Sequence, residues 1–171
     1  VCDEGESVLH CALRHGVEIP HFCHHEDLPT DAACRTCLVE VAPGKVTTSC
    51  DLKAKPGLKL STKSPAVQTL RRENLELMLA NHRKLCANCK RDLSCKTWDL
   101  MNKFKVTGTK YQRATIKALV HKLGTAAEFD PQACINCNKC VEMCQKIGIG
   151  FLKLTGKGAQ SHLSYNEDPC V

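Results

Sequence analysis

The most constraining feature of the sequence is a run of metal-ligand side chains with the spacing H-x3-C-x2-C-x5-C. Its members are His82, Cys86, Cys89 and Cys95. Three of them can become thiolates and the fourth is an imidazole, and both groups bind soft or borderline metals. One such set alone would suit zinc. Two further cysteine sets share this chain of 171 residues, so thiolates dominate and the pattern favours iron-sulfur clusters.

The other two sets lie on either side of the first. The upstream set has the spacing C-x10-C-x2-C-x12-C and consists of Cys23, Cys34, Cys37 and Cys50. The downstream set has the bacterial ferredoxin spacing C-x2-C-x2-C-x3-C and consists of Cys134, Cys137, Cys140 and Cys144. In two-cluster ferredoxins the fourth cysteine of such a run ligates the other cluster. We therefore expect Cys134, Cys137 and Cys140 to share one four-iron cluster, and Cys144 to join Cys170 at a second, incomplete site.

The composition agrees with clusters that take the place of an apolar core. The chain has 14 cysteines and only 4% aromatic residues. Three ligand sets imply three modules of roughly fifty residues each, and a module of that length is small for an apolar core of its own. The cysteines could instead form disulfides in a secreted protein. Repeated C-x2-C pairs argue against that alternative. Cys2 and Cys11 lie outside any ligand spacing, and we expect them to be inert small residues.

The formal charge of +6 invites a nucleic-acid interpretation. Bound clusters weaken it, because an oxidised four-thiolate cluster carries a charge of about −2. We expect the basic residues Arg71, Arg72, Lys103, Lys105 and Lys110 to be solvated surface and predict no nucleic-acid partner. No apolar run approaches the length of a membrane span. No catalytic metal site or Gly-rich phosphate loop is recognisable, so we assign no catalytic residues.

Local patterns predict short elements around the ligands. Ser7 is the expected N-cap of a first helix that ends near Gly16. Residues 38–41 are strand-like, and residues 59–62 are a candidate closing strand. Ser64 and Pro65 form a good N-cap and first-turn pair.

The helix that Pro65 begins should run to about Asn81 and deliver His82 to its cluster. Its expected core face consists of Val67, Leu70, Leu77 and Met78. A further helix is expected around residues 114–122.

Three segments carry a resemblance to known families: IPHFCHH, CRTCLVEV and TTSCDL. Together with the histidine-containing set, they resemble the iron-sulfur subunits of respiratory NADH dehydrogenase and of iron-only (FeFe) hydrogenases. The resemblance implies an α+β fold in three parts. Residues 1–63 would form a plant-type ferredoxin-like β-grasp domain with a 2Fe-2S cluster and an incomplete first hairpin. Residues 64–110 would form a small helical domain with a histidine-ligated 4Fe-4S cluster. Residues 111–171 would form a bacterial ferredoxin-like 4Fe-4S domain, truncated inside its second motif.

The function implied is electron transfer through a chain of clusters. The short separation of Cys144 from Cys170 and the segment QKIGIGFL favour the accessory-cluster region of an iron-only hydrogenase. The alternatives are the iron-sulfur subunit of NADH dehydrogenase and the small diaphorase subunit of an NAD-linked hydrogenase. A more remote alternative is a structural zinc protein that binds a partner.

The expected partners are a redox carrier, such as ferredoxin or an NADH-oxidising subunit, and a downstream catalytic domain. The expected location is a reducing compartment, either the cytoplasm or a hydrogenosome-like organelle of an anaerobic eukaryote.

Overall fold

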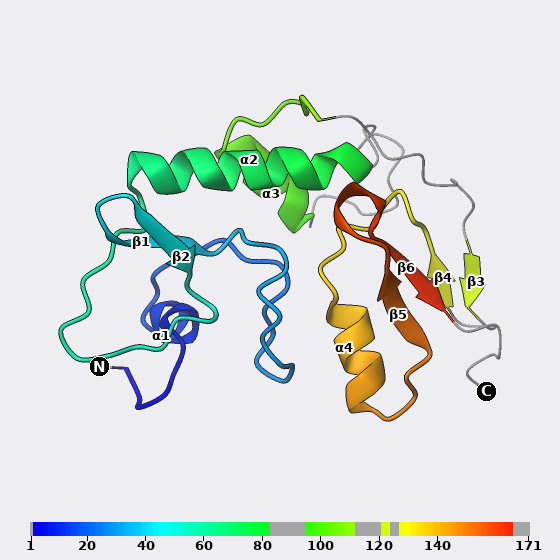
Figure 1. The fold of residues 1–171 in the computed structure, drawn as a ribbon, viewed down its shortest axis with the longest axis horizontal. Coiled ribbons are helices and arrows are strands. Elements are labelled where there is room, and N and C mark those ends of the chain that lie inside the picture. The colour runs from blue at the N-terminus through cyan, green and yellow to red at the C-terminus, as the bar shows by residue number, and fades with distance from the viewer. Residues whose placement is uncertain (1, 83–94, 112–120, 124–126, 166–171) are drawn as a thin grey trace.

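The computed structural model describes residues 2–82, 95–111, 121–123 and 127–165. Figure 1 shows the elements in these ranges. The helices are α1 (Val8–Arg14), α2 (Pro65–Asn81), α3 (Lys96–Lys103) and α4 (Lys139–Lys146), with a 3-10 turn at Gly158–Gln160. The strands are β1 (Leu38–Ala42), β2 (Lys45–Thr48), β3 (His121–Leu123), β4 (Ala127–Phe129), β5 (Leu152–Thr155) and β6 (His162–Tyr165).

The strands of the described ranges form three separate antiparallel pairs, β1 with β2, β3 with β4 and β5 with β6. The expected strand at 38–41 is confirmed as part of β1. The expected closing strand at 59–62 contributes only an isolated bridge, in which Glu40 and Ser61 exchange backbone hydrogen bonds of 2.9 and 2.8 Å. The molecule is therefore a small mixed α and β protein, and the described residues do not show the larger sheet of a β-grasp fold.

Both predicted helix starts in the first half of the chain are confirmed. The Ser7 hydroxyl accepts a hydrogen bond from the His10 amide at the start of α1, and Gly16 follows the helix with a φ of 73°. The Ser64 hydroxyl accepts from the Val67 amide, and Pro65 opens α2. These caps satisfy amides that a helix leaves without an internal partner.

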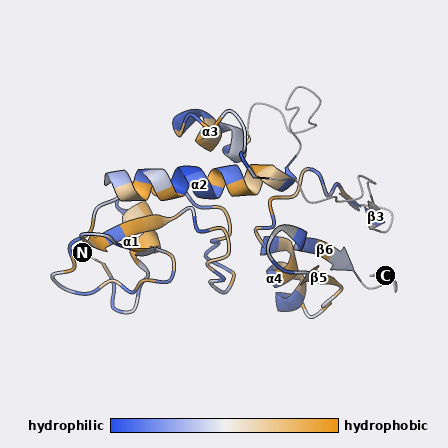
Figure 2. Ribbon diagram, turned by 45° about the horizontal axis from the view of Figure 1, so that its top comes forward, coloured by the Kyte–Doolittle hydropathy of each residue, from blue (hydrophilic) through white to orange (hydrophobic). Residues whose placement is uncertain are grey.

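The buried face of α2 differs from the predicted one. Leu70 and Leu77 are 39% and 50% exposed. The buried residues of α2 are Val67, Arg71, Leu75, Leu79 and Ala80. Figure 2 shows hydrophilic residues midway along this helix, which gives it a weak apolar stripe. Contacts with β1 and α3 therefore decide which side is covered.

The cysteines of the first set belong to two hydrophobic clusters. The first cluster consists of Leu9, Ile19, Cys37, Val39 and Cys50. The second consists of Phe22, Cys23, Cys34, Leu75, Leu79, Leu100 and Val106. It joins α2 and α3 to the loop that carries Cys23 and Cys34. The four thiols are thus part of the core, as the low aromatic content led us to expect.

The second half of the chain places α4 against the β5–β6 hairpin (Figure 1). The helix expected at 114–122 is wrong for His121 and Lys122, which lie in β3. Residues 114–120 lie outside the described ranges. In the part of the chain that the structure describes, none of the helices has the length and apolar character needed to cross a bilayer.

Candidate metal centres

The first set gathers four buried thiols from three segments. Cys23 lies in a loop after α1, Cys34 and Cys37 lie in the loop before β1, and Cys50 follows β2. The sulfurs of Cys23 and Cys34 are 3.3 Å apart, and none of the four is in a disulfide. Four converging thiols inside a core fit the donor set of a two-iron cluster.

The loop around Cys34 contains two left-handed residues and buries the Cys34 and Thr36 side chains. Ala32 and Arg35 have φ values of 51° and 47°, in the left-handed region that non-glycine residues seldom adopt. The Thr36 hydroxyl lies 3.2 Å from the Cys34 sulfur. Local strain of this kind is typical of functional loops that their surroundings hold in place.

A second set of bonds ties Cys37 to the Cys50 segment. The Ser49 amide and hydroxyl both donate to the Cys37 carbonyl, at 2.9 and 2.7 Å. Ser49 is completely buried, so these bonds are shielded from water. They hold the segment that contains Cys50 beside Cys37.

The thiols act in two hydrogen-bonded pairs. A hydrogen bond from Cys23 lowers the pKa of the Cys34 thiol to about 4. A hydrogen bond from Cys50 lowers the pKa of the Cys37 thiol to about 7. The donors themselves have raised pKa values, first because they share their proton with the partner thiolate and second because they are buried. Metal binding needs thiolates, and the hydrogen bond within each pair favours the thiolate of one member.

A buried guanidinium lies beside this set, which the sequence did not predict. Arg71, an expected surface residue, is only 4% exposed. Its Nη1 donates to the Thr62 carbonyl at 3.0 Å, and its Nη2 donates to the Leu38 carbonyl at 2.6 Å. Burial lowers the pKa of Arg71 to about 10, and the charge of the Cys37 thiolate opposes that shift. The two-iron site therefore has a permanent cation as a neighbour.

The second set lies between α2 and α3. His82 is the residue that ends α2, and its amide donates to the Leu79 carbonyl at 3.2 Å. Cys95 is the N-cap of α3 and is partly buried. Leu79 and Leu100 pack in one cluster, so the two helices are held together. Cys86 and Cys89 lie outside the described residues, and the four-ligand assignment stays a prediction.

The third set follows β4 and continues into α4. Asn136 and Asn138 have φ values of 52° and 62°, and these left-handed turns separate Cys134, Cys137 and Cys140. Burial raises the pKa of the Cys134 and Cys140 thiols.

Cys144 differs from the other three residues of this set. It is buried on α4, and its sulfur accepts from the Phe151 and Leu152 amides at 3.2 and 3.5 Å. Amides that donate to a cluster sulfur are one of the levers by which proteins set its potential. Cys170 lies outside the described residues, so the sharing of a site by Cys144 and Cys170 stays a prediction.

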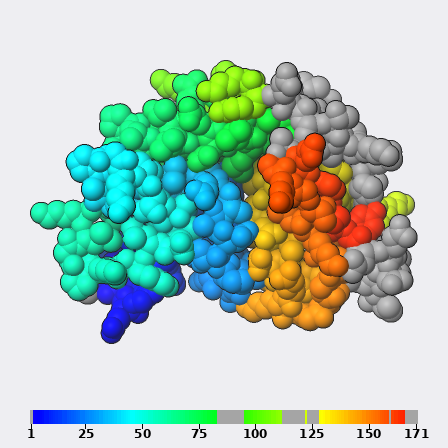
Figure 3. Space-filling view, viewed as in Figure 1, coloured from blue at the N-terminus to red at the C-terminus, as the bar shows by residue number. Residues whose placement is uncertain are grey.

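The first and third sets are neighbours in space. Cys34 and Cys134 both line a cavity of about 500 Å³. Asn138 Nδ2 donates to Asp31 Oδ2 at 3.0 Å, and Lys146 Nζ donates to the Asp27 carbonyl at 2.6 Å. Figure 3 shows the loop before β1 in blue against the yellow and orange C-terminal part. Sequence patterns do not indicate this contact, because the residues involved are far apart along the chain.

The structure corrects the expectation for Cys2 and Cys11, the two described cysteines outside the three sets. Cys2 and Cys11 are not separate inert residues, since their sulfurs are joined in a disulfide. Spacing patterns predict ligands of one metal, whereas a single disulfide depends on two segments that happen to meet.

Comparison with known proteins assigns the class of these sites. Residues 1–65 match the 2Fe-2S iron-sulfur cluster binding domain family, and residues 71–110 match the NADH-ubiquinone oxidoreductase-G iron-sulfur binding region. The chain is 30% identical to the mitochondrial NADH dehydrogenase [ubiquinone] iron-sulfur protein 1 of Solanum tuberosum, over 91% of its own length and 21% of the relative. It is 29% identical to the NADH-ubiquinone oxidoreductase 75 kDa subunit of Reclinomonas americana, over 94% and 24% of the two chains.

A solved structure agrees with these relatives. A chain in the crystal structure of an NAD+-reducing [NiFe]-hydrogenase in the H2-reduced state has a TM-score of 0.89 and 30% sequence identity. The match covers 98% of this chain and 71% of that one. At this identity and coverage the likeness concerns ancestry as well as fold.

The fold, the thiol sets and the matches define an iron-sulfur protein with a 2Fe-2S domain and a 4Fe-4S region. The chain belongs to the family that includes the iron-sulfur subunit of NADH-ubiquinone oxidoreductase and a chain of the NAD+-reducing hydrogenase. It spans less than a quarter of the length of the two curated relatives named above. These relatives favour the NADH dehydrogenase and diaphorase alternatives over the iron-only hydrogenase that QKIGIGFL suggested.

Proposed function

We propose that this chain is the electron-transfer region of an NAD-linked oxidoreductase, of the NADH dehydrogenase or NAD-reducing hydrogenase type. The observation that carries the proposal is the shared cavity lined by Cys34 and Cys134. It brings one residue of the two-iron site and one residue of the third cysteine set to the lining of the same space. A protein that only stored metal would have no need for such proximity.

Each ligand set has a defined part in this proposal. Iron-sulfur clusters accept and release single electrons when they are bound. The first set holds the two-iron cluster through four core thiols, with Arg71 as a nearby positive charge. His82 and Cys95 are the first and last residues of the second set. They are positioned by α2 and α3, which pack together. Cys134, Cys137 and Cys140 hold a four-iron cluster, and the two amides that donate to Cys144 stabilise negative charge on its sulfur.

The partners follow from the relatives and from the ligand chemistry. The proposed donor is an NADH-oxidising subunit, and the proposed acceptor is a further redox domain or subunit. Both proposals take support from relatives whose names state NADH dehydrogenase or NAD+-reducing hydrogenase activity. Thiol-ligated clusters persist best in a reducing compartment, which is the proposed location.

The first test uses the 171-residue chain purified without oxygen. Iron and acid-labile sulfide analysis with a visible spectrum should show iron-sulfur clusters, and a colourless protein that holds zinc would overturn the proposal. EPR spectra of the dithionite-reduced chain should resolve a two-iron signal that the Cys37→Ala variant lacks. A Thr47→Ala variant, changed in the neighbouring strand β2, should keep that signal.

The second test concerns the donor. NADH together with the NADH-oxidising subunit of a related enzyme should bleach the visible absorption of the clusters, whereas NADH alone should not. Reduced chain should then pass its electrons to methyl viologen or a similar dye. Failure to be reduced by the NADH-oxidising subunit, with normal reduction by dithionite, would remove the NAD link while leaving the electron-transfer assignment intact.

A further inference from the structure

The Cys2–Cys11 disulfide lies outside all three cluster sets and has two unlike ends. Cys2 is exposed in the segment before α1, whereas Cys11 is buried on the inner side of that helix. An incoming thiol can therefore reach the sulfur of Cys2 but not that of Cys11. Exchange depends on which sulfur is accessible and on how well the other sulfur leaves.

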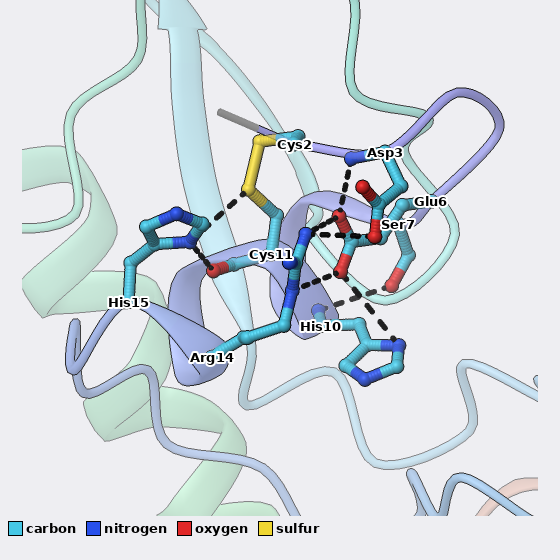
Figure 4. Close-up of polar contacts among 8 residues, drawn as sticks. All are labelled: Cys2, Asp3, Glu6, Ser7, His10, Cys11, Arg14 and His15. Atoms are coloured by element: carbon cyan, nitrogen blue, oxygen red, sulfur yellow. Dashed lines mark hydrogen bonds and ion pairs between the residues drawn. A yellow bond between two sulfur atoms is a disulfide. The ribbon is translucent and has the colours of Figure 1, made fainter.

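A histidine one turn further along α1 lies beside the buried sulfur (Figure 4). His15 Nδ1 is 2.8 Å from the Cys11 carbonyl and 3.8 Å from the Cys11 sulfur. A carbonyl can only accept, so Nδ1 carries the hydrogen of that bond. The same N–H faces the sulfur that would leave as a thiolate, and a neighbouring donor stabilises such an anion.

A polar network holds the Cys2 segment in place independently of the disulfide. Arg14 Nη2 lies 2.8 Å from Glu6 Oε2 and 3.0 Å from Asp3 Oδ2. The Asp3 amide also donates to Glu6 Oε2 at 2.8 Å. After the sulfur bond opens, these contacts keep Cys2 close to Cys11. The reduced pair thus stays arranged for the reverse exchange, in which the disulfide form of the co-substrate is the oxidant.

We propose that Cys2 and Cys11 form a thiol-disulfide exchange site whose co-substrate is a low-molecular-weight thiol or dithiol. The incoming thiolate attacks the Cys2 sulfur, the Cys2–Cys11 bond breaks, and the Cys11 sulfur leaves with the electron pair. That thiolate keeps the His15 Nδ1–H as its neighbour and takes a proton from water, and a mixed disulfide remains on Cys2. A second reductant thiolate releases Cys2, so one reductant disulfide forms for each protein disulfide reduced.

The first turn of α1 connects the exchange site to the segment of the two-iron set that contains Cys50. The Val8 and Leu9 amides donate to the carbonyls of Leu52 and Ser49, at 2.8 and 2.9 Å, on both sides of Cys50. These backbone bonds do not depend on the sulfur pair. Exchange at Cys2 should therefore proceed with the two-iron cluster still bound.

The test uses the cluster-loaded 171-residue chain under argon. Residues 1–14 form one tryptic peptide that contains Cys2 and Cys11 and no other cysteine. After incubation with glutathione, an acid quench and alkylation, mass spectrometry of this peptide reports the disulfide, the adduct and its position. We expect a disulfide before treatment, an adduct on Cys2 at least about tenfold above that on Cys11, and unchanged iron content. Absence of the disulfide before treatment, equal adducts, or iron loss in step with the adduct would each overturn the proposal.

Two histidines near α1 provide a matched comparison. His15→Phe should slow the reduction of the pair by dithiothreitol about fivefold or more, because phenylalanine keeps an aromatic ring but has no N–H for the leaving sulfur. His10→Phe makes the same change in the histidine that faces Glu6 at 3.9 Å and should leave the rate within about twofold. Equal rates in the two variants would contradict the role of His15. In Cys11→Ser no disulfide can form, so Cys2 should react with oxidised glutathione, releasing one glutathione thiolate, and keep the adduct; an adduct equally stable in the wild-type chain would contradict the assignment of Cys11 as the resolving thiol.

Discussion

Arg71 Nη2 donates a hydrogen bond of 2.6 Å to the carbonyl of Leu38, the residue that follows Cys37 of the first thiol set. This bond joins the middle of α2 to the first residue of β1. Because the second bond of the guanidinium reaches the Thr62 carbonyl, one side chain connects three segments around the two-iron site. Its role is thus structural and electrostatic at once.

Replacing Arg71 with Met should destabilise the protein. Met keeps most of the apolar stem but leaves the Leu38 and Thr62 carbonyls without their donors, at a cost of about 2 kcal/mol. For a chain of this size that corresponds to a fall in Tm of about 4 to 8 °C. The fall in Tm can be measured by thermal unfolding under anaerobic conditions, with circular dichroism as the signal. Arg72→Met is the control, because Arg72 makes an exposed pair with Glu76 and should change stability by less than about 1 kcal/mol.

The same substitution should lower the reduction potential of the two-iron centre. A buried positive charge favours the reduced, more negative cluster, and its removal should shift the potential by something on the order of 50 mV. An EPR redox titration of Arg71→Met against Arg72→Met separates this effect from a general change of surface charge. Equal potentials in the two variants would show that the guanidinium is too far away or too well screened to matter.

The corrected face of α2 can be tested with two leucines. Leu75 is 1% exposed in the cluster that contains Cys23 and Cys34, whereas Leu77 is 50% exposed. Leu75→Ala should lower the free energy of unfolding by about 3 kcal/mol. Leu77→Ala should cost less than about 1 kcal/mol. Similar losses would place both side chains in the core and would restore the face expected from periodicity.

Replacing His82 with Cys should retain the middle cluster but lower its reduction potential. Imidazole is neutral and thiolate is anionic, and histidine ligands raise the potential of Rieske centres relative to cysteine. His82→Ala should lose the cluster, which iron analysis would record. An unchanged or higher potential in the cysteine variant, measured by EPR titration, would mean that His82 is not a ligand.

Alkylation of the metal-free chain should distinguish Cys37 from Cys50 by pH. Cys37 reacts only as a thiolate, so its rate should rise around pH 7, the lowered pKa set by the hydrogen bond from Cys50. Cys50, whose pKa is raised, should stay unreactive at that pH. The two residues fall in different tryptic peptides, so mass spectrometry reads them separately. Cys50→Ala should move the Cys37 midpoint upward, towards the ordinary value of 9.0.

The same shift links pH to stability. The thiolate of Cys37 is favoured in the folded chain, so its contribution is fully present above the unfolded pKa near 9.0 and is lost as the pH falls through about 7. The metal-free Cys50→Ala variant should show a weaker dependence of Tm on pH between these values. A dependence as steep as that of the wild type would assign the pH effect to other groups.

Elements with local causes can be predicted from the sequence. Ser64 and Pro65 determine the start of α2 through a cap and a preset φ, and both expected bounds of the helix are confirmed. The spacing within the thiol sets is also local, and the iron-sulfur clusters that it predicted are supported by the matched families; the individual ligands stay predictions. The iron-only hydrogenase parent is a weaker inference, because it depends on a short segment and on a distance between two cysteines.

Features that depend on distant contacts could not be predicted. Arg71 is buried because two carbonyls from other segments meet it, and the helical pattern alone assigns it to the surface. The disulfide between Cys2 and Cys11 depends on how the chain turns back onto α1. The cavity between Cys34 and Cys134 requires segments from the two halves of the chain to meet.

Helix α2 also sets a limit on how this chain can change in evolution. Arg71 is anchored at one point of the helix, and His82 lies about three turns further on. One inserted residue between them would rotate His82 by about 100° around the helix axis and advance it by about 1.5 Å. The histidine would then face away from the direction in which we predict its cluster. Substitutions on the exposed side of α2 should accumulate freely among descendants of this protein, whereas its length between these two residues should not vary.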